Sequence, residues 1–235
     1  MACVGPRFGA QRAAVVKSAA WRLFGPARIQ TSAARIHSQA RAEHFVVNEY
    51  GLLSSFVATP WRQRPSIFSK AGLSSAKLHV VEWAREVSSW ATIKWYLSGW
   101  KSKVFAAQAE ELYGIMNTAF AEGDAKTLSG VCFPNLLSKL KNDIKRRKGA
   151  IEWHKERTVK EAEVVQIRCG RLTTDFCIGQ VVVRVDQEQL VAAAGKKAAG
   201  KAVHVTEYVV FQRVVSDPSS PWSIYGKLAV PQWDK

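Results

Sequence analysis

The pattern of apolar residues changes at Gly149, and this change restricts the fold more than any other feature. Before it, apolar side chains recur at steps of three and four residues, the spacing of one helix face. This spacing predicts helices over 80–104, 105–122, 124–131 and 134–148. After it, β-branched and aromatic residues predict strands over 151–156, 161–170, 175–186, 203–215 and 222–230. Helices followed by an antiparallel meander imply an α+β fold, with helices packed on one side of a curved sheet.

The first 42 residues form a basic segment without any carboxylate, because the first acidic residue is Glu43. The segment contains seven cations: Arg7, Arg12, Lys17, Arg22, Arg28, Arg35 and Arg41. Segments that are rich in Arg and Ser and poor in acid are typical of mitochondrial presequences. We therefore expect residues 1–42 to be a mitochondrial leader that is cut within 31–42. The alternative is a basic arm that stays attached and binds nucleic acid.

The charge balance of the chain favours polyanionic partners. The 235 residues carry a formal net charge of +15, and their apolar fraction of 47% suits a folded domain. A basic surplus favours RNA or anionic lipid headgroups, and it does not distinguish between them. No stretch approaches the roughly 18 apolar residues that a membrane-spanning helix needs. Any membrane contact is therefore expected to be peripheral.

Residue types that carry catalysis are present, but they form no motif. The four cysteines show no pair at metal-ligand spacing, and none of the five histidines shares a motif with a carboxylate or a cysteine. Asp175 and Glu163 could act as a general base if the sheet enclosed a pocket, although nothing in their spacing is diagnostic. We expect no enzyme activity, no metal, no cofactor and no small-molecule substrate. The remaining alternative is a ligand-binding or isomerase-like cone.

The expected helix over 80–104 is unusually rich in aromatic residues. Its apolar stripe consists of Val80, Trp83, Val87, Trp90, Ile93, Leu97, Trp100 and Val104, while Trp95 and Tyr96 lie off the stripe. Trp beside Lys suits a bilayer interface, where the ring lies among lipid and the cation meets a headgroup. One alternative is that the stripe packs on the domain's own core. The other is docking on a membrane or a partner through Trp90, Trp95, Tyr96, Trp100, Lys101 and Lys103.

Two groups of cations are candidates for RNA contact. One lies in an expected extended basic arm over 43–79 and consists of Arg62, Arg64 and Lys70. The other lies on the helix over 134–148 and consists of Lys139, Lys141, Lys145, Arg146, Arg147 and Lys148. A cation that neutralises a phosphate releases counterions, whereas cations at a helix end also complement the helix dipole. No aromatic motif for base readout is present, so we expect contacts with the RNA backbone and shape.

Two segments together resemble a known family. Residues 108–128 contain Ala-Phe-Ala-Glu-Gly-Asp at 119–124, a turn that precedes a helix leading to a Leu- and Lys-rich one. The end of the chain has Val-Thr-Glu-Tyr-Val-Val-Phe-Gln-Arg over 205–213 and then Trp-Ser-Ile-Tyr-Gly-Lys-Leu over 222–228. In this order and spacing they resemble the Tim44-like domain family, over roughly 105–230. The resemblance implies a cystatin-like α+β cone over 105–235 without catalytic residues.

Two mitochondrial branches share that domain. One is a matrix-side subunit of the presequence translocase, with a long charged coiled region before the domain. The other is the large-ribosomal-subunit protein of the L-forty-five type, with a fungal ribosome-receptor relative. Residues 43–104 are short and Trp-rich here, which favours the ribosomal branch.

The ribosomal branch implies a matrix protein that is peripheral to the inner membrane. Its partners would be mitochondrial rRNA, neighbouring large-subunit proteins, and inner-membrane lipids or an insertase. Its role would be to bind rRNA near the polypeptide exit and to tether the ribosome for co-translational insertion. The alternative from the other branch is an adaptor of the translocase that tethers the import motor.

Overall fold

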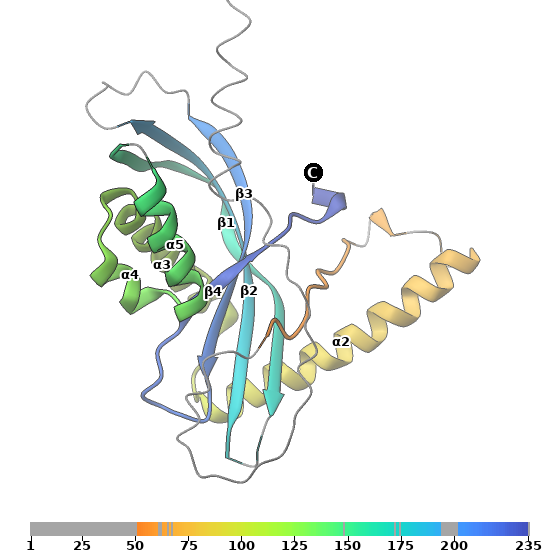
Figure 1. The fold of residues 1–235 in the computed structure, drawn as a ribbon. Coiled ribbons are helices and arrows are strands. Elements are labelled where there is room, and N and C mark those ends of the chain that lie inside the picture. Colours follow the sequence, from red (N-terminus) through yellow and green to blue (C-terminus); the bar gives the residue numbers. More distant parts are fainter. Residues whose placement is uncertain are drawn as a thin grey trace, which may run out of the picture. The chain divides into compact units, whose positions relative to one another are not determined.

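A computed structural model gives the fold of the chain (Figure 1). It describes residues 51–60, 63–64, 66, 68–147, 149–171, 173, 175–193 and 202–234. All of these belong to one compact unit, Thr31–Lys235. The expected leader over 1–42 lies outside the described residues, as do Arg62 and Lys148 of the candidate RNA-binding set.

The sheet consists of four antiparallel strands in the order β1-β2-β3-β4. The strands are β1 (Ile151–Arg171), β2 (Cys177–Ala193), β3 (Val203–Val214) and β4 (Ser223–Leu228). Two segments that the sequence predicts as separate strands, 151–156 and 161–170, belong to the single strand β1. Register shifts at Lys155/Arg157, Thr158/Lys160 and Lys160/Glu163 carry the ladder across the charged residues between them.

Three helices cover one face of the sheet, and they confirm the predicted α+β fold (Figure 1). They are α3 (Ser102–Glu122), α4 (Ala125–Val131) and α5 (Pro134–Arg146). Gly123 ends α3 with a φ of +80°, a left-handed conformation that glycine adopts without strain. The Asp124 side chain then accepts hydrogen bonds from the backbone N–H groups of Lys126 and Thr127, which begins α4.

The core lies between these helices and the sheet. Alternate residues of β2 and β3, such as Val181, Val183 and Phe211, meet Phe105 and Leu128 there. Each of the five side chains is at most 2% exposed. The two-residue period of the strands therefore directs one side of each strand toward the helices, as the sequence pattern predicts.

The opposite face of the sheet is covered by both ends of the described chain. Leu52 and Val57 from the segment 51–60 pack there, together with Trp233 from the 3-10 helix η2 (Gln232–Asp234), around Tyr208 and Val210. The backbone N–H of Leu53 donates to the Gln180 side chain over 2.8 Å. These contacts attach the segment before α2 to the sheet.

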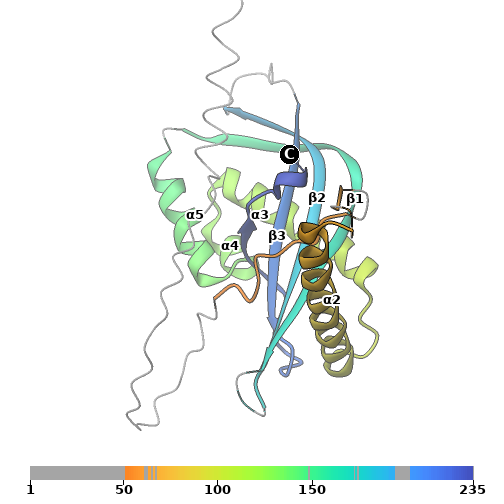
Figure 2. The same cartoon turned by 90° about the vertical axis from the view of Figure 1, so that its right-hand side faces the viewer.

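Helix α2 (Lys70–Tyr96) differs from the predicted helix over 80–104 and overlaps the predicted arm over 43–79. It begins early because Ser69 caps it, with the Ser69 Oγ accepting from the Gly72 N–H over 2.9 Å. It ends before residue 104 because the chain turns through Gly99, whose φ is +85°. The predicted continuous helix is therefore wrong, and its last residues belong to α3. Figure 2 shows α2 beside β1, which is an edge strand of the sheet.

Candidate polyanion and membrane-docking surfaces

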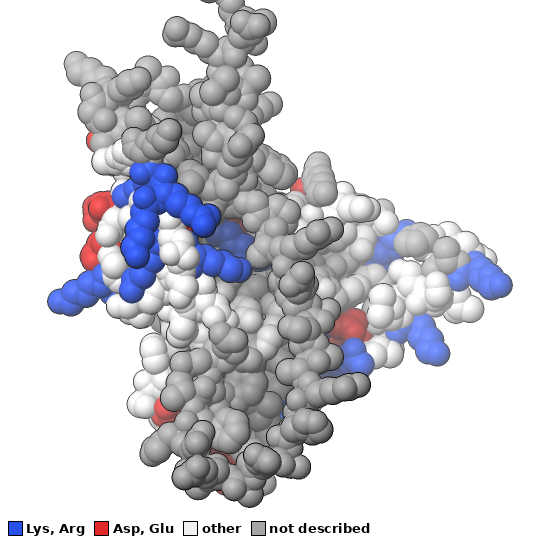
Figure 3. Space-filling view, in the orientation of Figure 1, with Lys and Arg blue, Asp and Glu red and all other residues white. Residues whose placement is uncertain are grey.

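The outer side of α5 carries a group of free cations. Leu140 is 4% exposed and directs the apolar side of α5 into the core. The opposite side presents Lys139, Lys145 and Arg146 to solvent, with Lys141 half-buried. None of these four cations forms an ion pair with any described residue. Figure 3 shows the cationic side chains gathered over α5, so this surface can attract a polyanion.

The other predicted RNA contacts have different surroundings. The Arg147 Nη1 donates to the Phe120 carbonyl over 2.8 Å, and its guanidinium lies 5.6 Å from the Phe120 ring centroid. This side chain therefore closes the C-terminal end of α3. The Arg64 Nε donates to the Thr59 carbonyl, and Lys70 lies at the exposed start of α2. Helix α2, which begins at Lys70, and helix α5 lie on different sides of the sheet, so the structure does not bring Lys70 together with the cations of α5 (Figure 1).

The outer face of α2 is apolar, while its inner face is largely polar. Val80 and Trp83 are 63% and 64% exposed. Glu82 and Ser89, which face β1, are 8% and 7% exposed. Of the predicted stripe, only Ile93, Leu97 and Trp100 pack on the core, and Val104 at its end is exposed. A largely buried polar side and an exposed apolar side reverse the usual arrangement of a surface helix, so the outer face is a candidate docking surface.

The predicted docking residues fall into two groups. Trp95 is 85% exposed and Trp90 is 39% exposed, with the Lys94 Nζ 4.7 Å from the Trp90 ring centroid. Lys101 and Lys103 are also exposed. Tyr96 and Trp100 instead pack against the core, and the Trp100 ring lies 5.9 Å from that of Phe105. The structure therefore leaves Trp90, Trp95, Lys101 and Lys103 available for docking.

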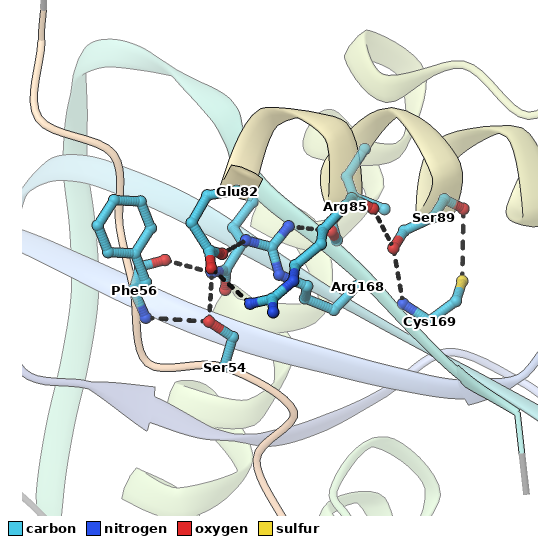
Figure 4. A network of polar contacts seen from close by, with 9 residues as sticks. Ser54, Phe56, Glu82, Arg85, Ser89, Arg168 and Cys169 are labelled. Atoms are coloured by element: carbon cyan, nitrogen blue, oxygen red, sulfur yellow. Dashed lines mark hydrogen bonds and ion pairs between the residues drawn. The ribbon is translucent and has the colours of Figure 1, made fainter. Parts of the chain in front are cut away.

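A polar seam, formed by Glu82, Arg85, Ser89, Arg168 and Cys169, holds α2 against β1 (Figure 4). The Arg168 guanidinium pairs with the Glu82 carboxylate over 2.5 Å, and Arg85 pairs with the same carboxylate over 2.7 Å. The Cys169 N–H donates to the Ser89 Oγ over 3.1 Å. The seam thus satisfies backbone and charged groups at the edge of the sheet. No motif of the sequence singles out these residues, although Glu82, Glu86 and Ser89 follow helical spacing.

The two carboxylates considered for catalysis do not share a cavity. Glu163 is exposed and pairs with Lys160 over 3.2 Å, and Asp175 is exposed as well. A cleft of about 630 Å³ lies between α2, β1 and side chains of the segment 56–66, and neither residue lines it. Glu86 does line this cleft, and burial raises its pKa while the nearby Arg168 partly offsets that rise.

The described part of the chain contains no cluster of three or more His, Cys, Asp or Glu side chains placed to bind a metal ion. Burial raises the pKa of the Cys132 and Cys169 thiols to about 12, so neither is a ready nucleophile. Of the described helices, none combines the length and the apolar character required to span a bilayer.

Comparison with known proteins relates this chain to a family. Over 193 residues the chain is 25% identical to "Large ribosomal subunit protein mL45" of Xenopus tropicalis, an alignment that covers 78% of this chain and 60% of that protein. The mL45 proteins of Bos taurus and Drosophila melanogaster are 26% and 23% identical, over 77% and 78% of this chain and 61% and 52% of theirs. The chain thus spans about 60% of the length of its vertebrate relatives. The family model described as "Tim44-like domain" matches residues 88–229. Because this match covers more than half of the chain, the protein belongs to the Tim44-like domain family.

Proposed function

We propose that this protein is a component of the mitochondrial large ribosomal subunit that binds rRNA and holds the subunit against the inner membrane. The observation that carries the proposal is the similarity to mL45 proteins, which extends over 78% of the chain. It reaches well before the matched family domain, since that domain begins at residue 88. The role is adhesive, and it requires neither a cofactor nor a small-molecule substrate.

The rRNA part of the proposal rests on α5. Lys139, Lys145 and Arg146 project from one side of a helix whose other side is fixed in the core. Cations held on a rigid helix can follow a phosphate backbone with little further loss of conformational freedom. Since no described acid neutralises them, their charge is available to a polyanion.

The membrane part of the proposal rests on the outer face of α2. The exposed Trp83, Trp90 and Trp95 offer rings that are favourable at a bilayer interface, and Lys94 and Lys101 lie close by in the chain. A helix that lies in the interface plane needs an apolar outer face with flanking cations, and α2 has both. Binding would be peripheral to the matrix side of the inner membrane, with lipid or an insertase as the partner.

Gradient fractionation of solubilised mitochondria, with and without RNase, tests the ribosomal assignment. We expect the protein to migrate with the large subunit and to leave that fraction after RNase treatment. Migration with a membrane complex that ignores RNase would instead support an adaptor of the presequence translocase. Migration as a free small protein would contradict both assignments and favour a ligand-binding cone.

A further inference from the structure

The polar side chains of α5 have a regular arrangement around Asn142, which lies at the centre of the exposed side. Successive residues of a helix are turned by about 100°, so Lys145 lies about 60° and Lys141 about 100° to one side of Asn142. By the same rule, Arg146 lies about 40° and Lys139 about 60° to the other side. Two cations therefore flank the amide on each side of α5.

The Asn142 amide is available to a ligand. Its side chain is exposed and forms no hydrogen bond with any described residue. Ser138, one turn earlier, is also exposed, and its hydroxyl group has no described partner. The carboxylate of α5, Asp143, is half-buried and lies at the border of this side. The exposed side of α5 thus combines neutral hydrogen-bonding groups with flanking positive charge.

The exposed side of α5 offers no surface on which an unpaired base could stack. Residues 134–146 include no aromatic residue. The ring of Phe133, directly before the helix, packs instead with its centroid 5.8 Å from that of Tyr225. Proteins that bind single-stranded nucleic acid commonly use aromatic rings as stacking platforms. The composition of α5 therefore favours a duplex, in which the bases already stack on one another.

Among nucleic-acid duplexes, A-form RNA fits the arrangement on α5. Its minor groove is wide and shallow, with a phosphate strand along each border and 2′-hydroxyl groups within reach. A helix that lies over this groove can place flanking cations near both strands and its central side chain near the hydroxyl groups. The Asn142 amide can donate to a 2′-hydroxyl and also accept from one. The minor groove of B-form DNA is about 6 Å wide, which is narrower than a helix with its side chains.

We propose that α5 binds the minor groove of double-stranded RNA, with Asn142 contacting 2′-hydroxyl groups and the flanking cations contacting both phosphate strands. The proposal rests on the rRNA part of the proposed function and extends it from attraction of a polyanion to recognition of one duplex shape. It also assigns a role to Asn142, which carries no charge and belongs to no motif.

The first test measures binding of the full chain to three probes by fluorescence anisotropy. They are an RNA duplex, a DNA duplex of the same sequence and one unpaired strand of the RNA. We expect the RNA duplex to bind at least about five-fold more tightly than the other probes, because it alone offers this groove. Equal binding to all three, or tighter binding to the DNA duplex or the single strand, would overturn the proposal.

The second test addresses the contact of Asn142. Asn142→Ala should weaken binding to the RNA duplex by about two- to ten-fold, the range expected for one hydrogen bond. The matched control, Gln108→Ala, removes an exposed amide of α3 and should leave binding unchanged.

A modified RNA identifies the group that Asn142 contacts. A duplex with 2′-O-methyl ribose keeps the A-form and loses the hydroxyl donors, so it should bind the wild type more weakly than the unmodified duplex does. Asn142→Ala should bind the two duplexes equally. If methylation weakens both proteins by the same factor, Asn142 does not contact the 2′-hydroxyl groups and the proposal is wrong.

The third test compares the cations on the two sides of Asn142. Lys141→Gln with Lys145→Gln, and Lys139→Gln with Arg146→Gln, should weaken RNA binding to similar extents. Each double replacement should reduce the slope of log affinity against log salt concentration by about 1.8, because two phosphate contacts are lost. The control Lys126→Gln, on an exposed part of α4, should leave the slope unchanged. A loss confined to one double replacement would mean that α5 contacts a single phosphate strand, which would overturn the groove geometry.

Co-sedimentation with the large subunit separates this proposal from the one on which it rests. If the wild type leaves the large-subunit fraction after RNase treatment, while Asn142→Ala binds the RNA duplex as the wild type does, the ribosomal assignment stands and the groove contact is wrong. If the folded wild type neither migrates with the large subunit nor binds either RNA probe, the rRNA part of the proposed function is wrong and the groove contact fails with it. Circular dichroism of each variant confirms folding, which the exposure of Asn142 leads us to expect.

Discussion

Glu82 and Arg168 are the charged residues on which the attachment of α2 depends most. Their side chains are 11% and 9% exposed, and Glu82 is the one carboxylate that forms an ion pair with Arg168 among the described residues, whereas Glu82 also pairs with Arg85. Replacing Glu82 leaves the Arg168 guanidinium without that partner in a place that water reaches poorly. The pair is therefore costly to break, although a pair of apolar residues of similar size could replace it.

Glu82→Ala is expected to lower the free energy of unfolding by about 3 kcal/mol, because Arg168 loses its buried partner. Urea denaturation followed by circular dichroism measures this change. The control is Glu161→Ala, which removes an exposed carboxylate 3.7 Å from Lys103 and should change stability by less than about 0.5 kcal/mol. Equal effects of the two variants would show that burial does not determine how much the Glu82–Arg168 pair contributes to the free energy of unfolding.

The Asp234 carboxyl group is expected to make the stability of the fold depend on pH in the acid range. Burial alone would raise the pKa of its carboxyl group, but hydrogen bonds from Arg184 and Tyr208, over 2.9 and 2.6 Å, outweigh burial and lower that pKa. A group with a lowered folded pKa stabilises the protein above its unfolded pKa, 3.8 here, and this contribution is lost as pH falls through the folded pKa.

Asp234→Asn should therefore lower the urea midpoint at pH about 7, where the carboxylate is charged. Below pH about 4 the wild type should lose stability more steeply than the variant, so their midpoints should converge. Parallel midpoints across this range would show that the Asp234 contacts contribute nothing to the acid dependence.

At the scale of the element, two neighbouring aromatic residues of α2 differ in their surroundings: Trp95 is exposed, and Tyr96 packs against the core. Trp95→Ala should leave the free energy of unfolding within about 0.5 kcal/mol of the wild type, because the ring is exposed. It should weaken vesicle binding roughly ten-fold, as a ring of this size loses its contact with lipid. Tyr96→Ala should instead cost about 1–3 kcal/mol of stability, since Tyr96 packs against the core. The reverse assignment would place the docking face on the other side of the helix.

The cations of α5 also differ in their surroundings, because Lys145 and Arg146 face solvent whereas Arg147 contacts Phe120. Lys145→Glu combined with Arg146→Glu should reduce co-sedimentation with the large subunit and make it more sensitive to salt, while stability stays nearly unchanged. Arg147→Ala should instead destabilise the fold by about 1–2 kcal/mol, because the Phe120 carbonyl loses one of its donors and the Phe120 ring loses the guanidinium beside it. Lys126→Glu, on an exposed part of α4, is the matched control for general charge. An equal loss with Lys126→Glu would exclude a specific α5 contact.

At the scale of the whole described unit, the two candidate surfaces lie on different sides of the sheet (Figures 1 and 2). The two proposed contacts, of α5 with a polyanion and of α2 with a membrane, can therefore form at the same time. This geometry predicts that the two activities separate. The α5 charge reversals should keep vesicle binding, and Trp90→Ala with Trp95→Ala should keep ribosome co-sedimentation. A loss of both activities in either variant would contradict two independent surfaces.

The local pattern of the sequence was sufficient for most of the fold. α4 and α5 begin where Asp124 and Pro134 indicate, and the β-branched runs of β2 and β3 gave their strands because both are covered on two faces. The start of α2 was missed because residues 70–79 have no apolar period, and only the Ser69 cap marks that end. Ordinary capping residues are too common in loops to reveal a helix alone.

The surfaces were less predictable than the fold, for a physical reason. An apolar stripe predicts that this side of a helix faces the core, and α2 departs from this rule because its polar side meets Arg168. That partner lies 86 positions away in the sequence, so no local pattern connects it with Glu82. For α5 the rule holds: Lys139, Lys145 and Arg146 face solvent as predicted. Arg147 instead turns back and donates to the Phe120 carbonyl.

The polar seam also works as a rotational lock on α2. Apolar contacts have no preferred direction and would allow a helix to roll against the sheet, whereas hydrogen bonds and ion pairs require defined angles. A shift of one residue would turn α2 by about 100° about its own axis and separate Glu82 and Ser89 from β1. The outward direction of Trp83 and Trp90 therefore depends on the ion pair and the hydrogen bond that Glu82 and Ser89 form with β1.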